Sequence, residues 1–236
     1  KSSWEQLKTE LDMVQNVTIA LGQKRIRKCL YFSTLAVYDD SITQQNLAED
    51  LLVYPQSPYG IAKFMGECLL ERVAIKMEFP LTIFRPCKIY GPGDRSFEYG
   101  PSSFLHSALM GKPVRLYGDG SELRDHLFIK DLVQIVDNFT NNDKSGIYNL
   151  ASGVSRTYQD ILVTIRKVVK KEFEIVNENR TRPLVDQTVD ISRLKQAVRG
   201  LNFTSIEQGI SETFRAMEHR FAKKTIKIGN IGKRFK

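Results

Sequence analysis

The sequence predicts an α/β fold in which helices pack on a parallel β-sheet. Residues 28–38 and 81–86 are apolar runs with the composition of buried parallel strands. Between them, residues 57–77 combine a helix-opening Ser-Pro pair with apolar residues at helical spacing. A strand, a helix and a second strand in this order form the unit from which parallel sheets are built.

The remaining elements follow in order. The spacing of apolar residues predicts helices and short strands along most of the chain. The predicted helices are residues 1–22, 101–111, 131–141, 158–171 (capped by Thr157), one opening at 190–194, and one entered at 203–206 and ending near Phe221; the predicted strands are 112–117, 146–151 and 172–176. Residues 40–54 and 87–94 are expected to be loops. In the helix after Tyr59, we expect Glu67 and Glu71 on the solvent side.

Composition excludes several classes of protein. The chain has 236 residues, of which 42% are hydrophobic, and a formal net charge of +8. We expect neither a membrane span nor a signal peptide, and the scattered cysteines indicate a reducing, cytoplasmic location. Cys29, Cys68 and Cys87 are scattered, which indicates no disulfide framework and no metal site, and we expect Cys29 and Cys68 in the core. Basic residues are spread along the chain, so we expect no nucleic-acid partner; only residues 223–236 form a basic tail, which we expect to be flexible.

The first candidate site lies at the start of the central helix. Tyr59 and Lys63 are four residues apart and share a helix face. A lysine ammonium favours the phenolate form of a nearby tyrosine, which suits it to acid-base chemistry near neutral pH. The hydroxyls of Ser33 and Thr34 stand where the preceding strand ends, and ligands bind at the carboxyl ends of strands in open α/β sheets.

These motifs resemble the extended short-chain dehydrogenase/reductase superfamily, specifically the NAD-dependent nucleotide-sugar epimerase/dehydratase family. The resemblance covers roughly residues 10 to 220. It depends on four ordered motifs, which are Ser33-Thr34, Tyr59-x-x-x-Lys63, the run from Arg85 to Asp94, and residues 118–132. It implies a Rossmann-like parallel sheet, here its later half, with a small α/β substrate-binding lobe.

The resemblance also implies a role for each candidate residue. Thr34, Tyr59 and Lys63 would be catalytic, with Thr34 aligning the sugar hydroxyl and Tyr59 exchanging its proton. The cofactor-binding residues would be Ser33, Tyr59, Lys63, Pro86 and Ile89; the substrate-binding residues would be Lys88, Arg124, Arg182 and Asp186. Arg124 and Arg182 would hold the diphosphate of a nucleoside-diphosphate sugar, because a guanidinium binds phosphate through paired donors. The resemblance also implies a homodimer.

Within the family, the sequence favours an epimerase. In the dehydratase branch an acidic pair follows the strand-end hydroxyl, whereas this chain has Leu35 and Ala36 there. NAD is the expected cofactor, with NADP possible. Two alternatives stay open: a non-catalytic nucleotide-sugar-binding or partner-binding protein, and an NADPH-dependent keto-sugar reductase.

One family motif has no counterpart in this sequence. Family members open with a Gly-rich turn that holds the cofactor pyrophosphate, and residues 1–28 contain none. We expect an incomplete view of a longer enzyme, with natural truncation as the alternative. The expected division is a partial NAD-binding domain (1–95 and 125–151), a substrate-binding lobe (96–124 and 152–222) and a basic tail (223–236).

Overall fold

The fold is built around a three-stranded parallel sheet. This computed structural model describes residues 3–39, 41–95, 97, 100–180 and 183–232. In spatial order, the strands of the sheet are β1 (Cys29–Phe32), β3 (Leu81–Pro86) and β7 (Gly146–Leu150). All of them are apolar runs that the sequence predicted as strands, and the predicted α/β fold is confirmed.

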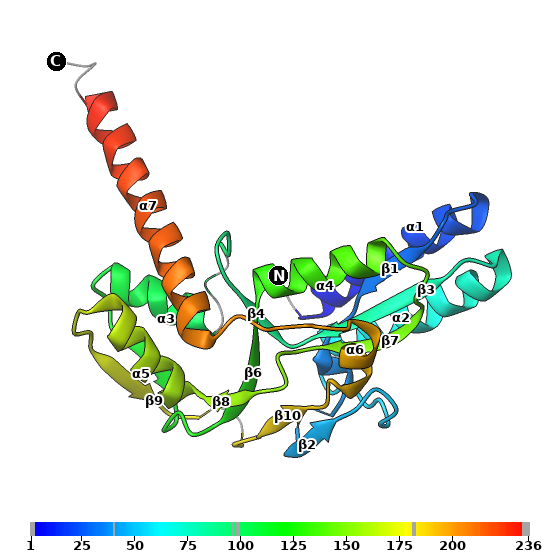
Figure 1. The fold of residues 1–236 in the computed structure, drawn as a ribbon, viewed down its shortest axis with the longest axis horizontal. Helices are drawn as coiled ribbons and strands as arrows, with labels where there is room; N and C mark the ends of the chain where they lie inside the picture. Colours follow the sequence, from blue (N-terminus) through cyan, green and yellow to red (C-terminus); the bar gives the residue numbers. More distant parts are fainter. Residues whose placement is uncertain (1–2, 40, 96, 98–99, 181–182, 233–236) are drawn as a thin grey trace.

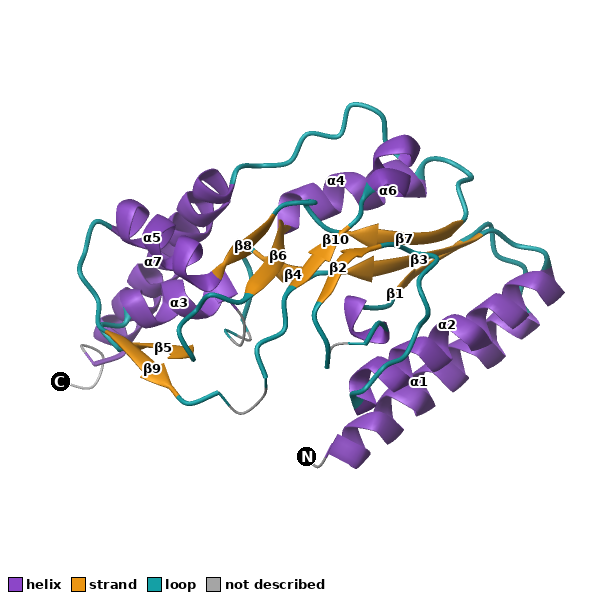
Figure 2. Cartoon of the chain, turned by 90° about the horizontal axis from the view of Figure 1, so that it is seen from below, coloured by secondary structure: helices purple, strands orange, loops and turns teal. Residues whose placement is uncertain are grey.

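Helices cover both faces of this sheet (Figure 2). On one face α1 and α2 pack against each other, and on the other lie α4 and α6. Their bounds are α1 (Ser3–Gln23), α2 (Pro58–Met77), α4 (Ile129–Thr140) and α6 (Ser192–Ala197). Phe84 of β3, Ile135 of α4 and Leu194 of α6 are fully or almost fully buried in one core cluster. This core holds the carboxyl ends of the strands in fixed positions.

The start of α2 is specified locally. The Ser57 hydroxyl accepts a hydrogen bond from the Gly60 N–H at 3.1 Å, and Pro58 occupies the first turn. The helix ends at Glu78, whose backbone is left-handed with φ 55°. This start places Tyr59 in the first turn of α2 and Lys63 one turn later on the same side.

A second group of elements lies beyond the carboxyl ends of the strands (Figure 1). It contains α3 (Gly100–Leu109), β5 (Val114–Tyr117), α5 (Tyr158–Val169), β9 (Ile175–Glu178) and α7 (Ile206–Gly232). Thr157 and Asp160 form the capping box that starts α5, as the sequence predicted. The first half of helix α7 packs on α5 and α3, and its C-terminal part projects away from the rest of the protein (Figure 1). The helix runs to Gly232, so residues 223–232 continue a helix that we expected to end near Phe221.

One 3-10 turn and several short strands join the two groups of elements. The turn is η1 (Leu35–Val37), and the strands are β2 (Gln44–Leu47), β4 (Lys88–Tyr90), β6 (Leu123–Phe128), β8 (Ser155–Thr157) and β10 (Gln187–Val189). β4 pairs with β6, which pairs with β8, and β2 pairs with β10. The expectation of loops at β2 and β4 was wrong because their partner strands are distant in sequence.

Two expectations about α2 were also wrong. Glu67, which we expected on the solvent side, is 3% exposed and pairs with Arg85 of β3 at 2.7 Å. Cys68, which we expected in the core, is exposed. Helical periodicity shows which residues share a face, but it does not show that an acidic side chain meets a buried arginine.

Candidate functional site

A pocket of about 790 Å³ lies between the carboxyl ends of the sheet strands and the second group of elements. Its walls come from η1, the start of α2, the β3–β4 junction, β5, β6 and the segment before and within β10. The lining residues from the sheet side are Thr34, Leu35, Ala36, Ser57, Tyr59, Pro86, Cys87, Lys88 and Ile89. From the other side come Tyr117, Glu122, Arg124, Asp125, Arg180, Pro183, Val185, Gln187 and Val189.

The pocket brings together most of the residues that the sequence singled out. Thr34, Tyr59, Pro86, Lys88, Ile89 and Arg124 all line it. Ser33, Lys63 and Asp186 do not. Ser33 is buried at the strand end, and Asp186 accepts a hydrogen bond from the Leu123 N–H at 2.8 Å. Arg182 lies outside the described residues.

Thr34 and Tyr59 meet where η1 approaches α2. The Thr34 hydroxyl caps η1 by accepting a hydrogen bond from the Ala36 N–H at 3.2 Å. Gly60 is packed so tightly there that an added Cβ would lie 2.2 Å from the Ala36 carbonyl oxygen. The lack of a side chain at Gly60 therefore lets α2 start directly against η1, which brings Tyr59 to the pocket.

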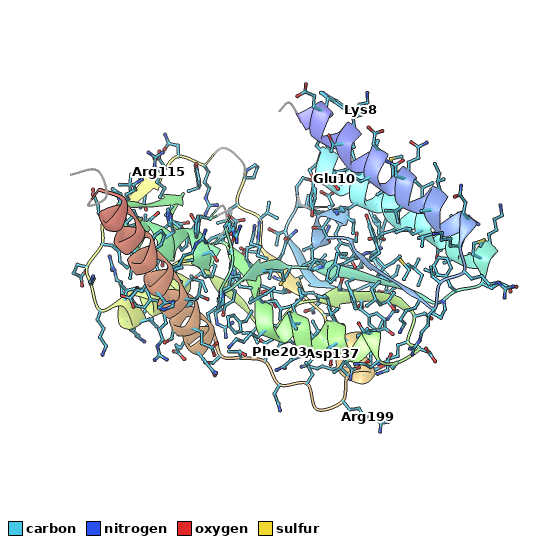
Figure 3. The ribbon with its side chains drawn as sticks, turned by 90° about the horizontal axis from the view of Figure 1, so that it is seen from above. Lys8, Glu10, Arg115, Asp137, Arg199 and Phe203 are labelled. Carbon is cyan, nitrogen blue, oxygen red and sulfur yellow. The ribbon has the colours of Figure 1, made fainter. Side chains whose placement is uncertain are left out.

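Lys63 sits behind Tyr59 on the side of α2 that faces α1. Its ammonium lies 5.7 Å from the ring centres of both Tyr59 and Tyr31, and 3.5 Å from a carboxylate oxygen of Glu10. Figure 3 labels Glu10 on α1. Burial, aided by the charges of Glu67 and Glu10, raises the pKa of the Tyr31 hydroxyl. Sequence reasoning missed Glu10, because no motif links α1 to α2.

Arginines gather at the opposite end of the pocket. Arg124 contacts the carboxylate of Glu122 and donates to the carbonyl oxygens of Leu123, at 2.8 Å, and Val185. Arg180 donates to Glu122 at 3.1 Å and to Asp119 at 2.9 Å. Sequence reasoning missed both Glu122 and Arg180. The sequence offered a signal for Arg180, because Arg180 and Arg182 stand two residues apart, but we predicted only Arg182 to bind the substrate.

A buried carboxyl also lines the pocket. Asp125 is 3% exposed and accepts hydrogen bonds from the Ser152 and Val154 N–H groups at 2.9 and 3.0 Å. The Cys87 thiol donates to it at 3.6 Å. Burial raises the pKa of the Asp125 carboxyl and holds the pKa of the Cys87 thiol well above its ordinary value. Neither group was a sequence-based candidate.

Among the residues that the structure describes, no three His, Cys, Asp or Glu side chains gather as metal ligands would. None of the described helices combines the length and the apolarity that crossing a bilayer requires.

Several proteins with assigned activities are similar to this chain in sequence. The chain is 27% identical to UDP-N-acetyl-alpha-D-glucosaminuronate decarboxylase of Bacillus cytotoxicus, over 93% of this chain and 73% of that protein. It is 27% identical to the trifunctional RHM2 protein of Arabidopsis thaliana, but spans only 29% of that protein's length.

Solved structures with this fold are similar over nearly the whole chain. UDP-glucose 4-epimerase from Thermotoga maritima matches with a TM-score of 0.82 and 22% identity, over 93% of this chain and 72% of that one. UDP-glucuronic acid 4-epimerase from Bacillus cereus, in complex with UDP-glucuronic acid and NAD, matches with a TM-score of 0.81 and 23% identity, over 89% and 67%. The described sheet and helices therefore form a Rossmann-like fold.

A family model links these similarities to the motifs. The model described as "NAD dependent epimerase/dehydratase family" matches residues 1–151. That range contains the strand ends, the start of α2 and the Arg124–Asp125 pair that shape the pocket. The chain therefore belongs to the NAD dependent epimerase/dehydratase family.

Proposed function

We propose that this protein is part or all of an NAD-dependent epimerase that inverts one carbon of a nucleoside-diphosphate sugar through a transient keto sugar. The observation that carries the proposal is the layout of the pocket. Thr34 and Tyr59 line it from the sheet side, and Arg124 and Arg180 line it from the other side. A sugar at the hydroxyl end and a diphosphate at the arginine end would use both sets of groups.

Tyr59 is the proposed acid and base. Its phenolate would take the proton of the sugar hydroxyl while the carbon loses a hydride, and its phenol would return that proton after hydride returns to the other face. Thr34 would orient the hydroxyl. Lys63, 5.7 Å from the Tyr59 ring, would favour the phenolate by its positive charge.

The described residues fit one end of the cofactor. NAD, when bound, supplies the hydride acceptor and donor. Tyr59, Pro86 and Ile89 line the pocket, and the buried Ser33 hydroxyl oxygen has no hydrogen-bond partner among the described residues, which fits a strand end built for a ligand. The described residues contain no succession of strand, Gly-rich turn and helix that could bind the cofactor pyrophosphate.

Two lining residues favour epimerisation over dehydration. Leu35 and Ala36 both line the pocket beside Thr34. Neither has an ionisable group, so neither can move the proton that eliminating water from the sugar requires. An epimerase needs no second acid at that place, because Tyr59 serves both half-reactions.

A second candidate function is binding without catalysis. β1 pairs only with β3 among the described residues, so one of its edges is open. Phe32 of β1 is 39% exposed, and with Leu132, Val133 and Val136 of α4 it lines an apolar groove of about 280 Å³. An open strand edge beside an apolar groove is suited to a partner polypeptide.

We also propose that the protein forms a homodimer. Helices α1 and α2 pack side by side and expose apolar side chains on their outer surface, namely Met13, Val17, Ile61, Met65 and Leu69. Two such helix pairs could bury these side chains against each other as a four-helix bundle.

The test begins with the purified full chain. Bound NAD is measured by its absorbance and fluorescence. The chain is then incubated with NAD and, in separate reactions, UDP-glucose, UDP-glucuronic acid and UDP-N-acetylglucosamine, and the epimers are separated by chromatography. We expect one epimer pair to interconvert, and Tyr59→Phe to slow turnover at least about a hundredfold.

A matched control separates chemistry from folding. Tyr54 is 62% exposed and lies outside the pocket lining, so Tyr54→Phe should keep full turnover. Full turnover by Tyr59→Phe would contradict the proposed mechanism. Nucleotide-sugar binding without NAD and without turnover would favour the second candidate.

A further inference from the structure

The arginine end of the pocket already contains an anionic side chain. The carboxylate of Glu122 lies between two guanidiniums, in contact with Arg124 on one side and 3.1 Å from Arg180 on the other. Glu122 lines the pocket with both arginines. The side chains of Glu122 and Arg180 are each 21% exposed and that of Arg124 is 14% exposed, so this cluster is only partly screened by water.

A second carboxylate on Arg180 differs from Glu122 in its position. Asp119 accepts a hydrogen bond from Arg180 at 2.9 Å, but its side chain is 68% exposed and does not line the pocket. Hydrogen bonds from Ser121, followed by the one from Arg180, lower the pKa of Asp119 to about 2. Asp119 therefore balances Arg180 from outside the pocket, whereas Glu122 does so from inside.

We propose that Glu122 occupies the anion subsite of this pocket and competes with the diphosphate of an incoming nucleotide for Arg124 and Arg180. The proposal depends on the proposed function, since it takes the ligand to be a nucleoside diphosphate or its sugar ester. Binding then requires Glu122 to turn away from the guanidiniums. Glu122 is thus a residue that sets affinity, and it keeps the arginines ordered between binding events.

The competition follows from the chemistry of the two anions. Carboxylates and phosphates use the same paired N–H donors of a guanidinium. A diphosphate bound to both arginines would bring its negative charge close to the Glu122 carboxylate. Like charges that lie close together in a partly buried site repel each other strongly. Removing only the charge of Glu122 should therefore strengthen diphosphate binding, while leaving the shape of the side chain almost unchanged.

The experiment measures nucleotide affinity of the full chain by isothermal titration calorimetry. The probes are UDP and dTDP, with uridine and thymidine as ligands that lack phosphate. We expect Glu122→Gln to lower the Kd for the nucleoside diphosphate that binds by about tenfold, and to leave nucleoside binding unchanged. The matched control is Asp119→Asn, which removes a carboxylate from the same arginine outside the pocket and should change the Kd by less than about twofold.

Each outcome decides the matter. Tighter diphosphate binding by Glu122→Gln, including binding seen only in this variant, supports the inference. Unchanged or weaker diphosphate binding by Glu122→Gln, in a protein whose wild type binds, overturns the inference and leaves the proposed function standing. An equal gain from Asp119→Asn also overturns it, because general charge would then explain the effect. No binding of UDP or dTDP by either protein overturns the inference, and with it the proposal that the substrate is a uridine or thymidine diphosphate sugar.

Discussion

Arg85 and Glu67 form a two-pronged ion pair inside the protein. The Nε and Nη2 atoms of Arg85 donate to the two carboxylate oxygens of Glu67 at 3.0 and 2.7 Å, and the side chains are 2% and 4% exposed. Arg85 also donates to the Tyr38 hydroxyl at 2.9 Å, which in turn donates to Asn149 at 3.0 Å. This network ties α2 to β3 and β7 just behind the pocket.

We predict that Glu67→Gln lowers the free energy of unfolding by about 3–5 kcal/mol, because it leaves the Arg85 charge buried without its counter-ion. Urea denaturation measures the change. Glu71→Gln is the control, since Glu71 is exposed on the same helix and should change stability by less than about 0.5 kcal/mol. Equal losses in both variants would contradict a special role for the buried pair.

The tight contact of Gly60 gives a second prediction. An added Cβ at Gly60 would lie 2.2 Å from the Ala36 carbonyl oxygen, so Gly60→Ala should push the start of α2 away from η1. We expect a loss of about 1–3 kcal/mol in stability, and weaker turnover because Tyr59 moves with the helix start. Gly22→Ala is the control. Nothing lies within 4 Å of a Cβ added there, and alanine favours the helix. Gly60→Ala with wild-type melting temperature would refute this reading of the contact.

The central part of the fold was predictable because its signals are local. The runs 28–38 and 81–86, the Ser57-Pro58 helix start and the Thr157 cap each act over a few neighbouring residues. The pairing of β2 with β10 was not predictable, since Gln44 lies opposite Gln187 and neither segment is apolar. The burial of Glu67 was not predictable either. Its partner Arg85 is on another element, and helix periodicity cannot identify it.

The candidate site was predictable to the extent that motifs mark it. The strand-end hydroxyl, the helix-start tyrosine and Arg124 each stand in a recognisable short motif, and the fold brings them to one pocket. Glu10, Glu122 and Arg180 carry no motif. They matter because of what they touch across the chain, and only the three-dimensional structure shows those contacts.

The Glu10–Lys63 pair leads to a third prediction. With its carboxylate 3.5 Å from the Lys63 ammonium, Glu10 offsets the charge that would favour the Tyr59 phenolate. Glu10→Gln should therefore leave more of the Lys63 charge to favour the Tyr59 phenolate, and raise turnover severalfold. Turnover is measured in each protein with the epimer pair that the wild type interconverts. Asp12→Asn, an exposed change on the same helix, should have no effect. Lower turnover in Glu10→Gln would count against the proposed role of Lys63.

The exposed apolar surface of α1 and α2 gives a fourth prediction. We expect the chain to sediment as a dimer, and Met65→Glu to convert it to a monomer, because a buried unpaired carboxylate at the interface is costly. Val163→Glu is the control. Val163 is 52% exposed on α5, away from the α1–α2 surface, and its change should leave the dimer intact. A wild type that sediments as a monomer would contradict the proposed homodimer.

The last prediction concerns stability against pH. His126 is 4% exposed, and burial, followed by the nearby charge of Lys88, lowers its pKa from 6.5 to about 3. The unfolded chain therefore binds a proton at this residue between those pH values, whereas the folded chain does not. Stability that is present above pH 6.5 is then lost as the pH falls toward 3.

Between pH 7 and pH 5 this loss amounts to about 2 kcal/mol. His126→Phe removes the titration and keeps a ring of similar size, so its free energy of unfolding should fall about 2 kcal/mol less over the same interval than that of the wild type. Other groups, including Asp125, titrate in both proteins, so their contributions largely cancel in the comparison. His219→Gln, which replaces an exposed histidine, is the control. Parallel pH profiles for the wild type and His126→Phe would show that His126 is not kept neutral by its burial.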